Sequence, residues 1–212
     1  CNSHKNCIPM MGLHPCSIDA GYSNTLEKIR IELFNSKEQY IAVGEIGIDL
    51  YWDQKYVKEQ SDAFRLQIQW AKELKLPIVI HARESYPEIF AVLDEENDSN
   101  LKGVFHCFSG TESDAAHILS YGGFKMGIGG TITYKKSKLP DVIKNIALEH
   151  ILLETDSPYL APRPFRGKRN ESSYLSFVVT KLSEIYECSE SQIIERTTLN
   201  AEELFNIQKF IS

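Results

Sequence analysis

The sequence predicts an α/β fold, namely a TIM (β/α)8-type barrel of which about six strand–helix units are present. Short apolar segments alternate with helical segments along the 212 residues without a long linker, as expected for a parallel sheet with helical crossovers. Eight such units occupy about 250 residues, so six take about 190, close to the length of the chain. An open, doubly wound sheet of six strands fits the same alternation.

The individual elements follow from local signals. The helix expected over 57–75 carries Val57, Phe64, Ile68, Ala71 and Leu74 on one face. Pro77 ends it, and Gly122-Gly123 closes a later helix. The strands are expected at 8–14, 41–45, 78–81, 104–106, 125–132 and 150–155, and the helices at 24–34, 57–75, 87–95, 114–121, 139–146, 173–186 and 189–206.

Composition limits the class of protein. With 42% hydrophobic residues, the chain is expected to form one domain over 1–212. A net charge of -6 argues against a generally cationic nucleic-acid-binding surface but allows a local basic patch. Five cysteines without paired spacing favour reduced thiols. Without a signal peptide or an apolar stretch of spanning length, we expect a cytoplasmic monomer that does not enter a membrane.

Four apolar runs end on residues that can bind a metal or move a proton. These residues are Glu45, His81, His106 and Asp156, the last within the run that begins at Ile151. The carboxyl ends of parallel barrel strands form one rim, so the four side chains are expected to meet there and to hold one or two divalent ions. Glu45 can offer one oxygen to each of two ions, and Asp156 can orient or deprotonate a metal-bound water. Both are therefore candidate catalytic residues.

Each of these residues also has a structural interpretation. Glu45 could pair with a basic residue of a neighbouring strand, and Arg83 is the one basic residue placed for this. A lone histidine at a strand end is usually a hydrogen-bonded core residue, whereas two at equivalent ends favour ligands. Asp156 could start a turn with Ser157 and Pro158. Zn, Mn, Mg and Ni all accept such ligands, so the sequence leaves the metal open.

Basic residues are expected near the same rim. Arg83, two residues after His81, is the strongest candidate for a phosphate clamp. A second group of basic residues is interrupted by Pro164, Phe165 and Gly167. These basic residues could bind phosphates while Phe165 or Tyr159 stacks on a base. A solvated basic loop is the alternative. This group comprises Arg163, Arg166, Lys168 and Arg169, and a further run is Lys135-Lys136-Ser137-Lys138.

Several strings together resemble the TatD family of metal-dependent deoxyribonucleases. The resemblance runs along the whole chain in the family's order. It is carried by Gly12-Leu13-His14-Pro15, Gly44-Glu45-Ile46-Gly47-Ile48-Asp49, Ile80-His81-Ala82-Arg83, His106-Cys107-Phe108-Ser109-Gly110, Glu154-Thr155-Asp156-Ser157-Pro158-Tyr159-Leu160, Arg169-Asn170-Glu171 and Thr198-Leu199-Asn200 with Leu204-Phe205.

The resemblance implies a barrel with divalent ions at its carboxyl rim. Glu45 would bridge the ions, His81 and His106 would bind one, and Asp156 would bind the other and activate water. His14 and Asp49 would contact water or the scissile phosphate. Many members carry a His-x-His pair on their first strand, whereas here His4 stands alone and the residues before Gly12 match the family's third strand. We therefore expect about two strand–helix units of the family to be absent from this sequence.

The resulting hypothesis is a metal-dependent hydrolase that cleaves phosphodiester bonds, with DNA as substrate, by attack of metal-bound water. A hydrolase of a small ester, amide or phosphoester on the same metal site is one alternative, because barrel loops choose the substrate. A non-catalytic barrel that binds nucleic acid or protein is the alternative from another class.

Overall fold

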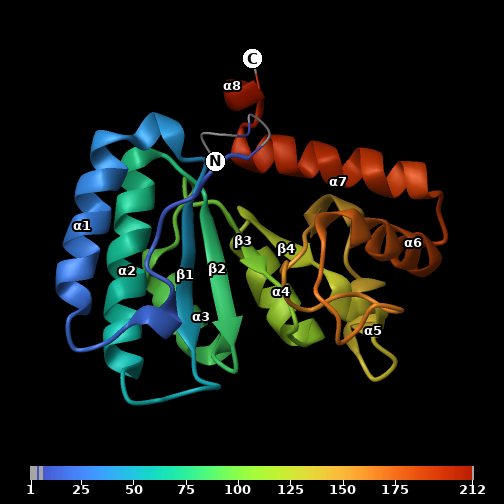
Figure 1. Cartoon of the computed structure of the whole chain (residues 1–212), viewed down its shortest axis with the longest axis horizontal. Coiled ribbons are helices and arrows are strands. Elements are labelled where there is room, and N and C mark those ends of the chain that lie inside the picture. The colour runs from blue at the N-terminus through green and yellow to red at the C-terminus, as the bar shows by residue number, and fades with distance from the viewer. Residues whose placement is uncertain (1–3, 5–6, 212) are drawn as a thin grey trace. The chain divides into compact units, whose positions relative to one another are not determined.

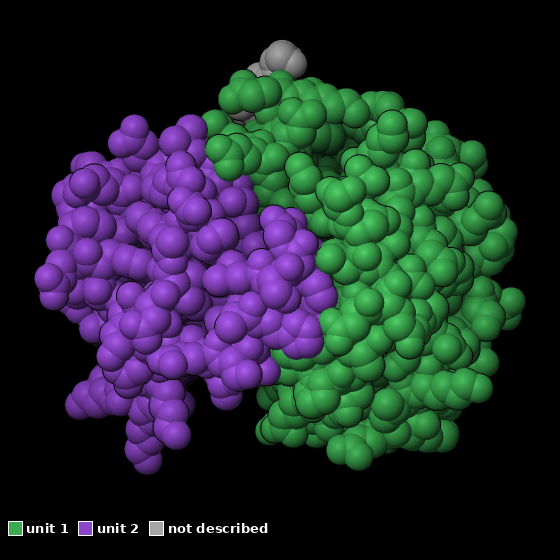
Figure 2. Space-filling view, turned by 180° about the vertical axis from the view of Figure 1, so that it is seen from behind, with its two compact units in different colours: residues 1–105, 202–212 green, residues 106–201 purple. Residues whose placement is uncertain are grey.

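A computed structural model describes His4 and residues 7–211 of the chain. The chain divides into two compact units, residues 1–105 with 202–212 and residues 106–201, coloured separately in Figure 2. Five strands are hydrogen-bonded in the order β1-β2-β3-β4-β5. The expectation of a single domain over 1–212 stays a prediction, and the units are described separately below.

The first unit contains two long parallel strands and the helices that accompany them (Figure 1). Helix α2 contacts β1, and the side chains of Phe64, Ile68 and Ala71 on its predicted apolar face are buried. The elements are α1 (Tyr22–Asn35), β1 (Val43–Asp49), α2 (Val57–Leu74), β2 (Ile78–Arg83), α3 (Tyr86–Glu96), β3 (Gly103–His106, whose last residue falls in the second unit), α8 (Gln208–Ile211) and short 3₁₀ turns at Pro15–Ser17 and Lys37–Gln39.

The pairing of β1 with β2 determines which side chains share a face. Between Val43 and Ile46, β1 advances three residues while β2 advances two, from Ile78 to Ile80, so β1 carries one extra residue there. Beyond this irregularity, Gly47 lies opposite His81. The register then continues to the ends of both strands, where Asp49 lies opposite Arg83.

The predicted strand over 8–14 is wrong. Its backbone makes one isolated parallel bridge, between Met11 and Val43, and no regular strand is assigned between residues 7 and 14. Pro9 has no N–H to donate. The backbone N–H and carbonyl of Leu13 bond to the side chain of Gln67, at 2.6 and 3.4 Å, and not to a strand. The buried side chain of Gln67 on α2 therefore forms the hydrogen bonds that a neighbouring strand would otherwise form with Leu13.

The second unit contains two short parallel strands and more helix. Met126 lies opposite Ile151 and Ile128 opposite Leu153. The elements are α4 (Glu112–Ser120), β4 (Phe124–Ile128), α5 (Leu139–Ile143), β5 (Ile151–Leu153), α6 (Leu175–Tyr186), α7 (Glu190–Phe205, whose last turn falls in the first unit) and 3₁₀ turns at Gly130–Thr133, Leu148–His150 and Ser172–Tyr174.

The predicted strand over 125–132 is too long. β4 ends at Ile128, and a 3₁₀ turn follows at Gly130–Thr133. A β-carbon on Gly130 would lie 2.3 Å from the carbonyl oxygen of Leu160, so the backbones of two loops meet closely there. The apolar Ile132 is buried, which explains why sequence periodicity extended the strand. Likewise, β5 is shorter than the predicted 150–155.

None of the helices in the described part of the chain combines the length and the apolar character that a bilayer-spanning segment requires.

Candidate metal centre

Glu45, Asp49 and His81 lie together in the first unit. Side chains alternate along the regular part of β1, so Gly47 and Asp49 share one face and Gly47 is the partner of His81, whereas Glu45 lies in the irregular stretch between Val43 and Ile46. Gly47 has φ 141°, and a β-carbon there would lie 2.1 Å from the carbonyl oxygen of His81. The imidazole of His81 lies between two carboxylates. Its Nε2 faces Asp49 and its Nδ1 faces Glu45.

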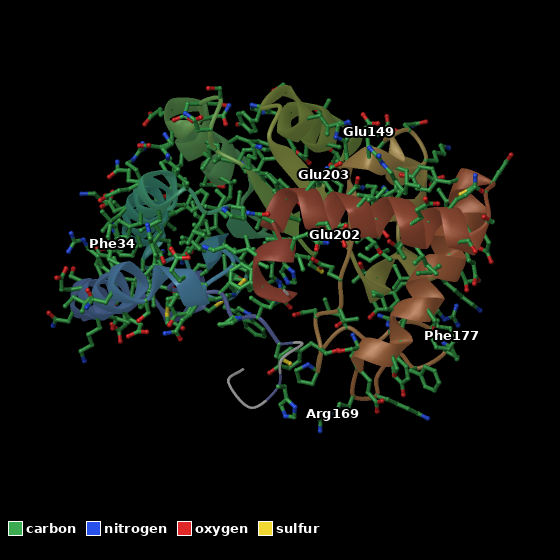
Figure 3. All side chains as sticks on the ribbon, turned by 90° about the horizontal axis from the view of Figure 1, so that it is seen from above. Phe34, Glu149, Arg169, Phe177, Glu202 and Glu203 are labelled. Atoms are coloured by element: carbon green, nitrogen blue, oxygen red, sulfur yellow. The ribbon has the colours of Figure 1, made fainter. Side chains whose placement is uncertain are left out.

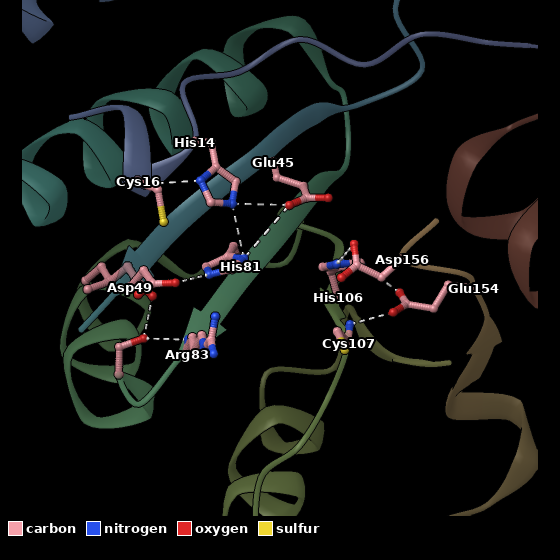
Figure 4. Close-up of polar contacts among 12 residues, drawn as sticks. His14, Cys16, Glu45, Asp49, His81, Arg83, His106, Cys107, Glu154 and Asp156 are labelled. Atoms are coloured by element: carbon pink, nitrogen blue, oxygen red, sulfur yellow. Dashed lines mark hydrogen bonds and ion pairs between the residues drawn. The ribbon is translucent and has the colours of Figure 1, made fainter. Parts of the chain in front are cut away.

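Asp49 orients His81. Its Oδ2 lies 2.8 Å from Nε2 of His81, and its Oδ1 accepts the backbone N–H of Tyr51 at 3.0 Å (Figure 4). Burial alone would raise the pKa of Asp49, but the hydrogen bonds from His81 and Tyr51, with the neighbouring imidazole and the Cys16 thiol, hold that pKa below its usual value. The ionised carboxylate can only accept a hydrogen bond, so Nε2 of His81 carries a proton and donates to it.

The structure places the Asp49 side chain behind His81, and the expected contact of Asp49 with water or the scissile phosphate stays a prediction. Its side chain is 2% exposed, and both oxygens are engaged inside the protein. A carboxylate behind a histidine fixes the ring and its tautomer, an arrangement common behind metal-bound histidines. With the proton on Nε2, His81 presents the lone pair of Nδ1 toward Glu45, whose Oε2 lies 3.9 Å away.

His14 completes a group of three candidate donors. Its Nε2 lies 3.5 Å from Oε2 of Glu45 and 3.3 Å from Nδ1 of His81. One ligand atom from each of His14, Glu45 and His81 lies within 4.8 Å of the others. The sequence hypothesis had assigned His14 to water or substrate, so the structure adds it to the possible ligands.

A backbone hydrogen bond determines which ring nitrogen of His14 carries the proton. The N–H of Cys16 donates to Nδ1 of His14 at 3.1 Å, and a backbone N–H can only donate. The neutral ring must then carry its proton on Nε2, which faces Glu45 and His81. Glu45 and His81 therefore fit a divalent cation as they stand, whereas His14 would have to shift its proton and lose the Cys16 bond to become a ligand. As it stands, His14 is a donor beside the cation site.

The Cys16 thiol is disfavoured from ionising in the metal-free protein. Desolvation of its sulfur, the charge of Asp49 and a hydrogen bond to Asp49 raise the pKa of the Cys16 thiol to about 11, against a lowering by Arg83. Without a metal, the thiol therefore acts as a hydrogen-bond donor to Asp49.

The second unit holds its own histidine–carboxylate cluster at the ends of β3 and β5. Glu154 Oε1 accepts the backbone N–H of Cys107 at 2.7 Å, and its Oε2 lies 3.0 Å from Nδ1 of His106. A proton on Nδ1 completes that bond, so His106 presents Nε2 on the side of Asp156, whose Oδ1 is 3.7 Å away (Figure 4). Sequence reasoning missed this role of Glu154, although Glu154 directly follows a buried strand.

The predicted basic residues of the second unit lie on an anchored loop. Arg163, Arg166, Lys168 and Arg169 are all exposed, and Figure 3 marks Arg169. The backbone N–H of Arg163 donates to Thr133 at 2.8 Å, and the guanidinium of Arg166 lies 4.5 Å above the ring of Tyr134. Because the run 135–138 follows Tyr134, these contacts bring the two basic segments together.

The aromatic residues of this loop differ in availability. Phe165 stacks on Tyr174 with ring centroids 4.2 Å apart, so one of its faces is covered, whereas Tyr159 is exposed. Asn170 is buried, and its amide donates to the carbonyl of Tyr159 at 2.7 Å. The backbone N–H of Tyr159 in turn donates to the carbonyl of Asp156. Asn170 therefore supports the turn that carries Asp156.

Comparison with known proteins shows the family of the chain. The family described as TatD related DNase matches residues 1–206. The chain belongs to this family. A relative in Bacillus subtilis, the uncharacterized metal-dependent hydrolase YabD, is 38% identical over 198 residues, covering 93% of this chain and 76% of YabD. A relative named 3'-5' ssDNA/RNA exonuclease TatD, from Cronobacter turicensis, is 31% identical over 208 residues, covering 95% and 78%.

Solved structures agree with the TatD assignment. The TatD homologue YjjV of Escherichia coli matches with a TM-score of 0.90 and 31% identity, covering 97% of this chain and 79% of that one. A TatD family hydrolase from Entamoeba histolytica shares the fold at a TM-score of 0.78 and 22% identity. These matches confirm the predicted TIM-type barrel class, here with five strands that hydrogen bonds do not close into a ring among the described residues. They also confirm the family resemblance and, with it, a metal-dependent hydrolase.

The predicted four-residue constellation is divided between the two units. Glu45 and His81 lie in the first unit, and His106 and Asp156 in the second. Each pair is brought together within its own unit, as the distances above describe. That all four share ions stays a prediction.

Proposed function

We propose that this chain is a phosphodiester hydrolase that acts on DNA and uses divalent ions bound at Glu45 and His81. The observation that carries the proposal is the orientation of His81. Asp49 holds a proton on Nε2, so Nδ1 faces the Glu45 carboxylate. Family membership supports hydrolysis with a metal, and the name of the Cronobacter relative supports a nucleic-acid substrate.

A bound divalent ion would supply a low-pKa water and would polarise the phosphate. Residues of the first unit prepare the substrate around it. His14 donates from Nε2 toward an oxygen held beside Glu45. Arg83, exposed at the end of β2, donates to a flanking phosphate oxygen. In the second unit, Asp156 can accept a proton beside Nε2 of His106, and the loop residues from Arg163 to Arg169 attract the nucleic-acid backbone.

The test measures cleavage of a labelled oligonucleotide and of bis(p-nitrophenyl) phosphate, a small phosphodiester without bases. Each metal (Zn, Mn, Mg and Ni) is added to protein stripped with a chelator. We expect oligonucleotide cleavage that requires metal, is lost in Glu45→Gln and persists in Glu73→Gln, because Glu73 is an exposed residue of α2. Cleavage of the small ester without cleavage of any oligonucleotide would favour the small-substrate hydrolase. Full activity in Glu45→Gln would contradict the proposed centre.

A further inference from the structure

The loop between β1 and α2 exposes two large aromatic side chains. Trp52 is 72% exposed and Tyr51 is 48% exposed. The other tryptophan, Trp70, is buried on α2, as is usual for so large an apolar side chain. Two adjacent exposed rings on one loop therefore require an explanation other than packing in the core.

The loop is anchored to the candidate metal centre. The carboxylate that orients His81 also accepts the backbone N–H of Tyr51, through the other oxygen of Asp49. The backbone of Asp49 is in turn clamped by Gln60, a buried residue of α2, with N···O distances of 2.8 and 3.2 Å. The position of the rings is thus coupled to the position of His81 by one side chain.

Arg83 completes a surface of three side chains. Its guanidinium carbon lies 3.6 Å from the centroid of Tyr51 and 5.3 Å from that of Trp52. The two rings meet edge to face, with centroids 4.8 Å apart and an angle of 87°. This geometry matches cation–π contact and leaves much of the Trp52 ring open to solvent.

The guanidinium keeps its hydrogen-bonding capacity. No carboxylate lies within ion-pair distance of Arg83 in the described part of the chain, so no internal partner there takes up its N–H donors. A planar fork of donors beside an exposed indole is suited to a ligand that has both a phosphate and a flat apolar ring. A nucleotide has both.

We propose that Tyr51, Trp52 and Arg83 form a platform for the nucleotide next to the scissile phosphate, where Trp52 stacks on its base and Arg83 binds its phosphate. The inference rests on the proposed function and deepens it. A base inside a duplex already stacks on its neighbours, whereas an unpaired base has a face to offer. The platform therefore selects a single strand, without reading the identity of the base.

Fluorescence gives a direct test, because the chain has two tryptophans. In Trp70→Phe, Trp52 is the one remaining tryptophan, and excitation at wavelengths that tyrosine does not absorb isolates its emission from that of the ten tyrosines. We expect a single-stranded oligonucleotide, added in EDTA to prevent cleavage, to quench this fluorescence and protect it from acrylamide. An oligonucleotide with abasic sites keeps the phosphates and should do neither. Equal quenching by both, or by neither, would overturn the platform.

Kinetics on the otherwise unchanged chain distinguish the platform from the proposed function. Base stacking contributes about 1–3 kcal/mol, so Trp52→Ala should lower kcat/KM on a single-stranded oligonucleotide by about 5- to 150-fold. Trp52→Phe should retain most of the activity, and cleavage of the abasic oligonucleotide, which has no base to stack, should not change in Trp52→Ala. The control is Phe34→Ala, which removes a ring of α1 that also lies under an arginine, Arg30 at 5.1 Å (Figure 3).

The outcomes separate clearly. If Trp52→Ala cleaves intact and abasic oligonucleotides with unchanged kcat/KM, the platform is wrong and the nuclease proposal stands. If the unmodified chain cleaves no oligonucleotide, both are wrong. If the Trp52→Ala chain loses activity on the abasic oligonucleotide as well, the loop supports the metal centre and is not a base platform.

Discussion

The two histidine–carboxylate clusters use opposite nitrogens of the ring. In the first unit, Asp49 engages Nε2 of His81, so Nδ1 faces Glu45. In the second unit, Glu154 engages Nδ1 of His106, so Nε2 faces Asp156. The orienting carboxylate thus decides which nitrogen can bind a ligand, and it does so before any metal arrives.

The clusters also differ in how firmly the orienting carboxylate is held. The Asp49 side chain is 2% exposed and comes from the strand beside His81, whereas the Glu154 side chain is 17% exposed and directly follows β5. The candidate ligand Asp156 is one-third exposed. We therefore expect substitutions in the first cluster to lower metal affinity and cleavage more than substitutions in the second.

The largest expected effect follows from removing the ligand of the first cluster. His81→Ala deletes the Nδ1 donor and leaves Asp49 buried without its imidazole partner. We expect divalent-metal affinity and oligonucleotide cleavage to fall by at least about 100-fold, more than for a residue that supports a ligand. Calorimetric metal titration and cleavage rates measure this. His117→Ala, on α4, is the control, and an unchanged affinity in His81→Ala would contradict the assignment.

The supporting carboxylates provide a direct comparison. Asp49→Asn and Glu154→Gln each replace one oxygen by an amide and remove the charge that fixes the histidine tautomer. Loss of such a partner lowers metal affinity or activity by about 10- to 100-fold. We expect Asp49→Asn near the upper value and Glu154→Gln near the lower, because Asp49 is more buried and also holds the Tyr51 backbone. Equal or reversed effects would break the comparison.

Two glycines test the backbone of each unit. Gly47 and Gly122 both have positive φ, but a β-carbon on Gly47 meets the His81 carbonyl at 2.1 Å, whereas one on Gly122 has nothing within 4 Å. Gly47→Ala should lower the free energy of unfolding by about 2 kcal/mol or more, and Gly122→Ala by about 1 kcal/mol. Urea denaturation at equal protein concentration shows which variant is less stable. A smaller loss of unfolding free energy in Gly47→Ala than in Gly122→Ala would contradict the close approach of Gly47 to the His81 carbonyl.

The smallest effect concerns the basic loop of the second unit. Arg166→Ala should weaken oligonucleotide binding in a salt-dependent way and reduce the slope of log affinity against log salt by about 1, as for one lost phosphate contact. Lys144→Ala, an exposed lysine of the same unit paired with Asp141, should leave the slope unchanged. The same slope in both variants would mean that the loop is solvated and does not bind phosphate.

Much of the first cluster was predictable because it obeys a simple rule. Glu45 and His81 each end an apolar run that predicts a buried strand, although β1 continues to Asp49 and β2 to Arg83. The family motifs also identify His14. The strands predicted at 78–81 and 104–106 and the helix over 57–75 are confirmed, whereas the strand predicted at 41–45 begins at Val43 and extends to Asp49.

The parts that could not be predicted depend on tertiary partners. The segment over 8–14 looks like a strand, but Gln67, 54 residues beyond Leu13, takes its hydrogen bonds. The roles of Asp49 and Glu154 depend on which histidine nitrogen each carboxylate meets, and spacing alone does not contain this information. The exposure of Trp52 is likewise a property of the folded loop.

The central claim is that Asp49 makes Nδ1 of His81 the metal ligand. A crystal of the protein soaked in Mn²⁺ or Zn²⁺ tests it through the anomalous signal of the ion. We expect an ion about 2.0–2.2 Å from Nδ1 of His81 and from a carboxylate oxygen of Glu45, with Asp49 still bonded to Nε2. An ion bound to Nε2 with Asp49 displaced, or no ion at these two residues, would contradict the account.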